Sequence, residues 1–268
     1  MSHDLVRCAY ADIGEGQIHY AECGPRGAPP VLLLHQTPRS WTEYRGVLPL
    51  LGQRYRAIAM DTAGFGASTR PREASIECWA QTAAALLDAL GIERAHVAGH
   101  HTGGVIALEL AAAFPARVAK LVLSSTPFTD AAFRRQRAER PPIDEVTVRA
   151  DGSHLAELWQ RRQPYYPPER PDLLHAFVGD ALKVIDRLEE GHQAVARYRM
   201  EERIDRVMHP VLLIRAGRDP FAGPHAQAMC DRLPQARLVE IAEGMVPLPD
   251  QLPQAYAAAV LEFLDAGA

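Results

Sequence analysis

The chain has 268 residues, of which 47% are hydrophobic and 23% are charged, and its formal net charge is −4. A chain of this length can bury a core without disulfides or a structural metal, and one domain with an insertion accounts for it. The mild acidity and the lack of a clustered basic stretch argue against nucleic acid as a partner, no apolar run approaches the roughly 20 residues of a membrane span, and the four cysteines lack metal-like spacing.

The first 90 residues predict strands followed by one long helix. The predicted strands are a hairpin at 5–12 and 17–23 and two further strands at 30–35 and 55–60. An amphipathic segment at 75–90 ends before Gly91 and predicts a helix. Because strands alternate with helical segments, the pattern favours a parallel sheet with helices on both faces.

The most informative segment is Gly99-His100-His101-Thr102-Gly103, between a predicted strand at 94–98 and an apolar, helix-favouring run that begins at Val105. It has the form of a nucleophile elbow, a strained strand-to-helix turn that pushes one side chain out over the edge of the sheet. Serine is the usual residue at the tip of that turn. In this sequence the tip is His101.

The pattern changes after a further strand at 119–123. From about 130 to 207 the strands disappear, and helix-compatible segments at 156–163 and 173–188 are separated by proline clusters. This composition predicts a helical cap inserted after the sixth strand. Strands at 211–214 and 236–241 and a helix at 252–264 complete the chain. We therefore predict an α/β core at 1–129 and 208–268, with the cap at 130–207.

Several segments resemble those of the α/β-hydrolase superfamily. They are the strand and turn at 31–38, the Asp-x-x-Gly-x-Gly-x-Ser turn at 61–68, the elbow, and the strand and loop at 211–220. The resemblance is to the capped branch, which includes small-ester hydrolases, C–C bond hydrolases, epoxide hydrolases, haloalkane dehalogenases and haloperoxidase-like esterases. It runs nearly end to end and implies an α/β-hydrolase fold, with a mostly parallel eight-stranded sheet, flanking helices and a helical cap.

The resemblance also implies where the catalytic groups lie. Thr37 supplies one oxyanion-hole amide, with Gln36 in place of the family's glycine, and Asp219 is the acid of the triad. The family's catalytic histidine aligns with Met245, whose thioether cannot transfer a proton. The order Ser, Asp, His therefore becomes His101, Asp219, Met245.

An imidazole reaches farther from the backbone than a serine hydroxyl, so the ring of His101 can project towards Asp219. We predict a dyad in which Asp219 orients His101, while the other ring nitrogen faces the substrate as a base or nucleophile. The amides of Thr37 and Thr102 would stabilise a developing oxyanion. The predicted function is an enzyme, a hydrolase or lyase without a cofactor, acting on an ester, lactone or C–C bond of a small, largely apolar, carbonyl-containing substrate.

Further residues are expected to contact the substrate, although each also has a structural interpretation. They are His35, Gln36, Arg39, Trp41, Met245, Trp159 and Tyr165. Arg39 is a candidate for clamping a substrate carboxylate. Met245 is expected to form an apolar wall, and the aromatic residues to line the cap side of the pocket. His100 is expected to point away from the tip and pack.

Two other interpretations remain open. The loss of both serine and histidine is compatible with a catalytically silent protein that binds a ligand in the same pocket. A metal-dependent enzyme using His35, His101 and Asp219 or Glu243 has suitable ligand types but no diagnostic spacing. Asp219 itself can alternatively cap a helix that begins near Pro224.

The remaining expectations concern location and partners. Residues 1–4 lead straight into a strand-like segment, which indicates no signal peptide and favours the cytoplasm. The expected partner is a small-molecule substrate, with no nucleic acid and no membrane, and a homo-oligomer is compatible with the composition.

Overall fold

The computed structural model describes residues 5–223 and 225–266, and the eight strands found there form one sheet in the order β1-β2-β4-β3-β5-β6-β7-β8. The strands are β1 (Arg7–Ile13), β2 (Gly16–Cys23), β3 (Pro30–Leu34), β4 (Arg56–Met60), β5 (Ala95–His100), β6 (Val118–Ser124), β7 (Val211–Ala216) and β8 (Ala236–Ile241). β2 pairs antiparallel with β1 and β4, and all other neighbours are parallel. The predicted strands are confirmed, with ends shifted by one or two residues.

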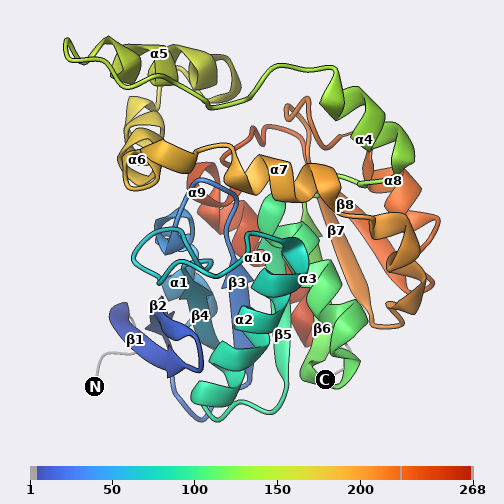
Figure 1. Cartoon of the computed structure of the whole chain (residues 1–268). Coiled ribbons are helices and arrows are strands. Elements are labelled where there is room, and N and C mark those ends of the chain that lie inside the picture. The colour runs from blue at the N-terminus through green and yellow to red at the C-terminus, as the bar shows by residue number, and fades with distance from the viewer. Residues whose placement is uncertain (1–4, 224, 267–268) are drawn as a thin grey trace.

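Helices cover both faces of the sheet (Figure 1). The core helices are α1 (Leu48–Leu51), α2 (Ile76–Ala89), α3 (Thr102–Ala113), α8 (His225–Cys230), α9 (Leu248–Gln251) and α10 (Pro253–Asp265). Alternate side chains of a strand face opposite sides, so Leu32 and Leu34 pack in the cluster with α2 and α3, whereas Val31 and Leu33 pack with α1 and α10. The predicted mostly parallel sheet with helices on both faces is confirmed.

Four helices lie between β6 and β7, at the end of the sheet where the parallel strands end (Figure 1). They are α4 (Ala131–Ala138), α5 (Ser153–Arg162), α6 (Pro171–Leu182) and α7 (Glu190–Arg197). We call this group the cap; its extent as a separate domain, 130–207, stays a prediction. The helix-compatible segment at 173–188 is helical up to Leu182 and then breaks, because Val184 leaves the helical region at φ −132° and is buried in the core cluster.

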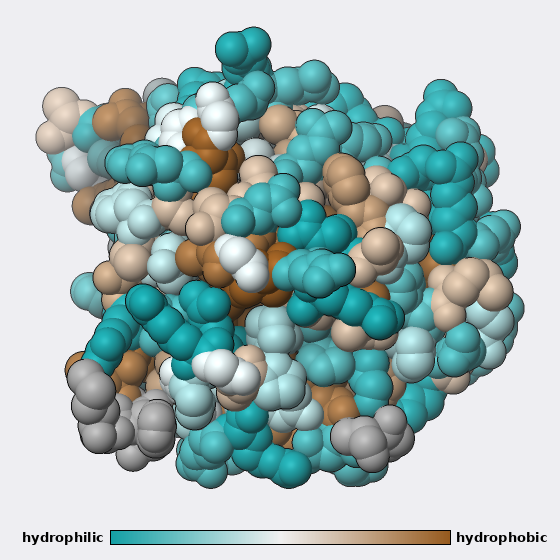
Figure 2. Space-filling model, turned by 90° about the horizontal axis from the view of Figure 1, so that it is seen from below, coloured by the Kyte–Doolittle hydropathy of each residue, from teal (hydrophilic) through white to brown (hydrophobic). Residues whose placement is uncertain are grey.

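The opposite end of the molecule is mostly hydrophilic, with hydrophobic residues in small groups near the middle of that face (Figure 2). In the described part of the chain, no helix combines the length and apolar character needed to cross a bilayer. Residues 1–4, on which the expectation about a signal peptide depends, and Pro224 lie outside the described residues. The helix expected near Pro224 is described from His225 onward.

Candidate active site

The strand-to-helix turn after β5 holds His101 in an uncommon backbone conformation, with φ 48° and ψ −114°. The glycines around it permit close contact between strand and helix. A Cβ on Gly99 would lie 2.1 Å from the carbonyl oxygen of Gly103, and a Cβ on Gly103 would lie 1.9 Å from that of Leu34. The sharp turn places the side chain of residue 101 at the end of the sheet, beneath the cap.

Asp219, in the loop after β7, lies directly beside the His101 ring. Its Oδ2 is 2.7 Å from His101 Nε2, although the angle is not that of a regular hydrogen bond, and neither atom has another partner in the described chain. The other oxygen, Oδ1, accepts a hydrogen bond of 2.8 Å from the Phe221 amide. Burial acts to raise the pKa of Asp219, but the His101 ring and the Phe221 amide outweigh it and hold the pKa at about 2. Asp219 is therefore a carboxylate at neutral pH.

His100 is completely buried, and its ring packs edge-on against the His101 ring, with the two ring centroids 4.6 Å apart. Its Nε2 donates to the carbonyl of Val246 at 2.7 Å, so Nδ1 accepts from the Ser124 hydroxyl at 2.9 Å. Burial, together with the neighbouring His101, lowers the pKa of His100 to about 3. This ring is a neutral structural link between β5, β6 and the loop after β8.

The turn after β3 presents the backbone amide of Thr37. The carbonyl of Gln36 accepts from the Arg39 amide at 3.0 Å and from His35 Nδ1 at 2.7 Å, so it points into the turn. In a trans peptide the carbonyl and the next N–H point in opposite directions, so the Thr37 N–H is directed away from the turn. It has no hydrogen-bond acceptor among the described residues.

Thr102, the first residue of α3, faces Thr37 across the site. Their hydroxyl oxygens are 3.0 Å apart, and both residues are buried. The first amides of a helix have no partner within the helix and lie at its positive end, and the amide of Thr102 has no acceptor in the described chain. The cap closes over this pair, because a Cβ on Gly191 of α7 would lie 2.2 Å from Thr37 Oγ1.

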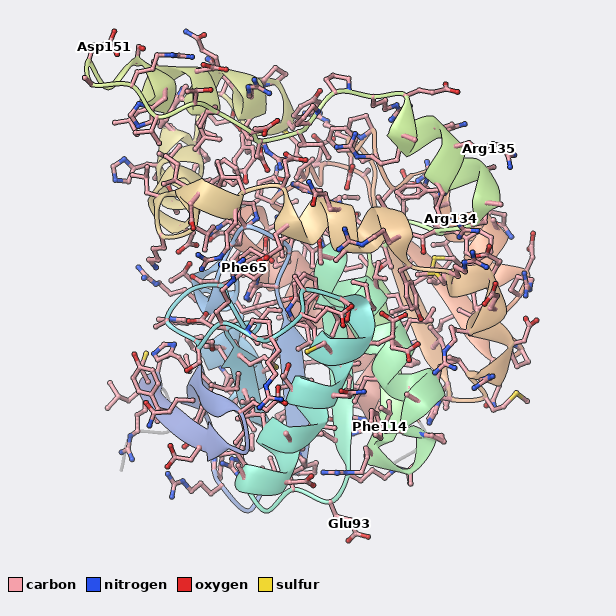
Figure 3. The ribbon with its side chains drawn as sticks, in the orientation of Figure 1. Phe65, Glu93, Phe114, Arg134, Arg135 and Asp151 are labelled. Atoms are coloured by element: carbon pink, nitrogen blue, oxygen red, sulfur yellow. The ribbon has the colours of Figure 1, made fainter. Side chains whose placement is uncertain are left out.

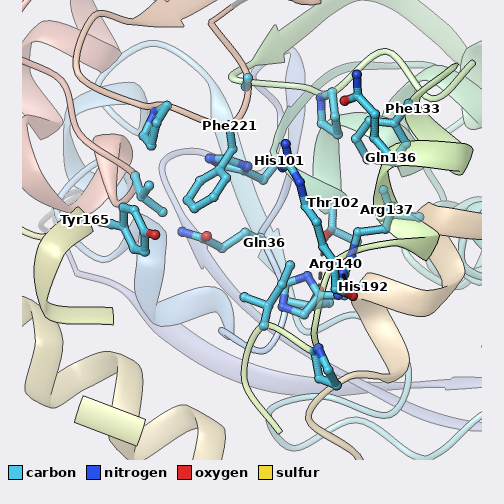
Figure 4. A pocket seen from close by; sticks show the side chains of 18 of the residues that line it. Gln36, His101, Thr102, Phe133, Gln136, Arg137, Arg140, Tyr165, His192 and Phe221 are labelled. Carbon is cyan, nitrogen blue, oxygen red and sulfur yellow. Dashed lines mark hydrogen bonds between the residues drawn. The ribbon is translucent and has the colours of Figure 1, made fainter. Parts of the chain in front are cut away.

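A cavity of about 710 Å³ lies between this end of the sheet and the cap. His101, Thr102, Thr37 and Gln36 line it from the core, and residues of α4, α5, α7, the segment 140–143 and the loop after β7 line most of the remainder. Figure 4 shows Tyr165 and Phe221 together on one side, and their ring centroids are 4.7 Å apart. The groups suited to acid–base chemistry therefore face a partly apolar, cap-covered space.

Of the residues predicted to contact substrate, only Gln36 and Tyr165 line the cavity. The prediction for His35 is wrong. Its ring is fully buried, with Nδ1 donating to the Gln36 carbonyl and Nε2 accepting from the Thr62 amide at 2.9 Å. Burial lowers its pKa, and with both nitrogens occupied it is not a metal ligand. The metal set based on His35 is therefore wrong as well.

Arg39 does not reach the cavity either. It is completely buried, with Nε 3.1 Å from Asp180 of α6 and Nη2 3.0 Å from Asp250 of α9. Asp180 also accepts from the Ser40 and Thr42 hydroxyls. Arg39 thus binds two carboxylates of the protein itself and joins the cap to the core.

Gln36 is held by the buried Glu43. One of the two contacts uses the Gln36 side chain, which a glycine at position 36 would lack. The Glu43 carboxylate accepts from the Gln36 backbone amide at 2.9 Å and from its side-chain amide at 2.5 Å. Burial raises the pKa of Glu43 to about 7, against the lowering effect of Arg39 and Gln36. The glutamine is therefore a fixed part of the turn.

The cavity predictions for Trp41, Trp159 and Met245 are also wrong. Trp41 lies under the Arg45 guanidinium, 5.5 Å from its ring centroid, and Trp159 packs against the main core cluster. Met245 does not line the cavity, whereas its neighbour Val246 does. The loop turns between these two residues, and the sequence motif alone does not reveal which of them faces inward.

The basic residues of the cap also belong to the cavity, although the sequence did not predict this. Arg137, Arg140, Arg161, Arg162 and His192 all line the cavity. The density of arginine at 134–140 is visible in the sequence, but the interspersed acidic residues suggested a solvated surface. Only the folded cap shows which arginines face inward.

One group of residues in the described chain has donor atoms close enough to hold a metal ion: Asp144, Glu189 and His192. Asp144 is already bound in a bidentate manner by the buried Arg162, and its backbone amide donates to Glu189. Burial acts against ionisation, but Arg162 and His192 lower the pKa of Asp144. The carboxylate of Asp144 is therefore already paired with Arg162 and His192 of the protein itself.

Comparison with known proteins identifies the family. A family model described as "alpha/beta hydrolase fold" matches residues 29–244. The chain belongs to this family. The protein named "Putative carbamate hydrolase RutD" of Azorhizobium caulinodans is 31% identical over 258 residues, which cover 88% of this chain and 90% of that protein.

"Epoxide hydrolase 4" of Mus musculus is 33% identical over 114 residues, which are 41% of this chain and only 32% of the mouse protein. The chain thus matches about a third of the length of that relative. A crystal structure of the enol-lactonase from Burkholderia xenovorans superposes with a TM-score of 0.80 at 22% identity, covering 96% of this chain and 99% of the other. That similarity concerns the fold alone.

Proposed function

We propose that the chain is a hydrolase in which His101 acts as a general base, oriented by Asp219, on a small carbonyl-containing ester or lactone. The observation that carries the proposal is the 2.7 Å separation of His101 Nε2 from Asp219 Oδ2, at the tip of the elbow and at the wall of the cavity. In this proposal His101 stands where family members carry serine, and Met245 stands in the sequence where they carry histidine. One imidazole then performs the proton transfers.

The reaction proceeds in two steps. In the first, His101 Nδ1 takes a proton from water while the water oxygen bonds to the substrate carbonyl carbon, and the carbonyl oxygen becomes an oxyanion. In the second, the oxyanion reforms the carbonyl, the bond to the leaving alkoxide breaks, and the imidazolium returns its proton to that alkoxide. Asp219 remains a carboxylate throughout, fixing the ring and stabilising its protonated form.

Two backbone amides support the oxyanion in this scheme. The N–H groups of Thr37 and Thr102 have no partners in the described chain, and their side chains meet at 3.0 Å beside the cavity. One such donor is typically worth roughly 3 kcal/mol of transition-state stabilisation. Glu43 contributes indirectly by fixing Gln36, and hence the orientation of the peptide that precedes Thr37.

The proposal is tested with 4-nitrophenyl acetate, 4-nitrophenyl butyrate and dihydrocoumarin as substrates. His101→Ala is expected to lower kcat/KM by about 10² to 10⁴, the usual contribution of a general base. Asp219→Asn is expected to lower it as well, because the amide does not stabilise the imidazolium. His225→Gln is the matched control, since His225 also lines the cavity but does not contact Asp219.

Mass spectrometry during turnover distinguishes a base from a nucleophile. A general base leaves no adduct on the protein, whereas direct attack by the ring gives an acyl-imidazole at residue 101. Loss of activity in His225→Gln equal to that in His101→Ala would contradict the assignment. If the wild type binds all of these compounds but hydrolyses none of them, the proposed hydrolase is refuted and a ligand-binding protein is favoured.

A further inference from the structure

The cavity has an unusual balance of charge for a protein with a net charge of −4. Four arginines line it, at positions 137, 140, 161 and 162, and none of the described residues that line it is an aspartate or glutamate. All four belong to the cap, whereas the groups proposed for proton transfer and for the oxyanion belong to the core. The cationic side of the cavity is thus separate from its reactive side.

Three of these arginines already have partners in the protein. Arg162 is bound by Asp144, Arg161 donates to Glu157 at 2.9 Å, and Arg137 is 3.3 Å from Glu189. The charges of these three arginines are therefore balanced by ion pairs within the cap.

Arg140 is different, because it has no acidic partner in the described part of the chain. Its backbone is fixed: Arg137 Nη1 donates to the carbonyls of Arg140 at 3.1 Å and Pro141 at 2.9 Å. Arg137 thus positions the segment that presents Arg140 to the cavity.

Arg140 also lines a second, smaller pocket. A smaller pocket of about 230 Å³ shares Arg137, Arg140, Pro142 and His192 with the main cavity. The guanidinium of Arg140 therefore borders both spaces, and Figure 4 shows it between His101 and His192. Arg140 is exposed, so its charge can attract anions from solution and hold them at the cavity wall.

We propose that the cavity selects substrates that carry a carboxylate, which Arg140 binds at the cap side. The apolar body of the ligand then packs against Tyr165 and Phe221, and its carbonyl group meets His101; this last placement rests on the proposed function. A single guanidinium without an acidic partner matches a monoanion, and its planar fork matches a carboxylate. The substrate class is accordingly an oxo or acyl compound with a free carboxylate at the end remote from the scissile bond.

The test measures binding, so that it is independent of turnover. The probes are 3-phenylpropionate, 4-phenylbutyrate and 5-phenylvalerate, each compared by calorimetry with its neutral primary amide. At least one acid is expected to bind the wild type about tenfold more tightly than its amide. Arg140→Gln should reduce that preference to less than twofold, and Arg140→Lys should retain part of it.

Arg135→Gln is the matched control. Arg135 lies on α4, the helix that precedes Arg140 in the chain, and carries the same charge, but it points outward from α4 while its neighbour Arg134 lies on the side towards Glu201 (Figure 3). It does not line the cavity. This variant should keep the full preference for the acid, because a charge outside the cavity acts only through screened long-range attraction.

Two outcomes overturn the carboxylate site: no acid in the series binding more tightly than its amide, or the same loss in Arg135→Gln as in Arg140→Gln. His101→Ala separates this proposal from the catalytic one. If that variant keeps the preference for the acid, the carboxylate site stands even where the esterase assays find no turnover. If esterase activity depends on His101 but no acid is preferred, only the carboxylate site fails.

Discussion

Substitutions at two glycines of the cap test whether α7 packs against the turn after β3 that carries Thr37. Gly191 is buried near the start of α7, and a Cβ there would lie 2.2 Å from Thr37 Oγ1 and 2.5 Å from Thr37 Cβ. Real Cβ atoms essentially never approach another heavy atom that closely, so Gly191→Ala must displace α7 or the turn. Gly179 of α6 is the control, because a Cβ there would meet nothing within 4 Å.

Both substitutions gain helix propensity, which for an exposed position within a helix is worth roughly 0.5–1 kcal/mol. Gly179→Ala should therefore raise the free energy of unfolding by about that amount. Gly191→Ala gains no more than this, because it lies at a helix end, and it loses about 1–3 kcal/mol to overpacking. The difference between the two variants isolates the steric conflict, and we expect it to be about 1–3 kcal/mol.

Urea denaturation followed by circular dichroism gives both values, with equal m-values as the sign that only stability has changed. If the proposed function holds, Gly191→Ala should also lower kcat/KM, because the displaced Thr37 turn no longer presents its amide. A difference below about 0.5 kcal/mol between the two variants, with α7 unmoved, would refute the seating of Gly191 on Thr37.

Three further predictions concern buried carboxylates and a helix cap. Because the pKa of Glu43 is raised from 4.5 to about 7, its stabilising contribution is complete below pH 4.5 and is lost as the pH rises through about 7. Urea denaturation at pH 5 and pH 8 should show a loss of about 2.5 kcal/mol in the free energy of unfolding that is absent from Glu43→Gln, whose amide can pair with Gln36; an equal loss in both would contradict the assignment. The pKa of Asp219 is lowered from 3.8 to about 2, so its contribution of about 2 kcal/mol is present above pH 3.8 and disappears towards pH 2, and Asp219→Asn should remove that acid dependence in thermal melts. Ser75→Ala should cost about 1 kcal/mol in urea denaturation, because the hydroxyl accepts from the Cys78 amide at the start of α2, whereas Ser75→Asp should keep most of that stability.

The periodic parts of the fold could be predicted from the sequence because each depends on local chemistry. The short apolar run of β3 and the serine at the start of α2 are both visible in the order of residues. The break in the helix at Val184 could not be predicted from local chemistry. That residue is buried by contacts with distant parts of the chain, and propensity alone does not include such contacts.

The candidate site could be located from the sequence, but its polar surroundings could not. Motif spacing places His101, Thr37 and Asp219 on loops that meet at one end of a parallel sheet. The position of the Arg39 side chain depends on Asp180, which lies 141 residues away in the cap. No local sequence pattern predicts that contact. The place of Arg140 in the cavity wall likewise depends on how the cap folds over the core, which the local sequence does not show.

The buried contact of Arg39 with Asp180 has a consequence for how the cap can move. Separating α6 from the core would break this buried ion pair, together with the hydrogen bonds that Asp180 accepts from the Ser40 and Thr42 hydroxyls. Among the described residues, α4 makes no ion pair or hydrogen bond with the turn after β3, and it supplies Phe133, Gln136 and Arg137 to the cavity wall. We therefore expect α6 to stay on the core while α4 moves away from it. Hydrogen exchange should then be slower in α6 than in α4, and the ligand should enter and leave beside α4.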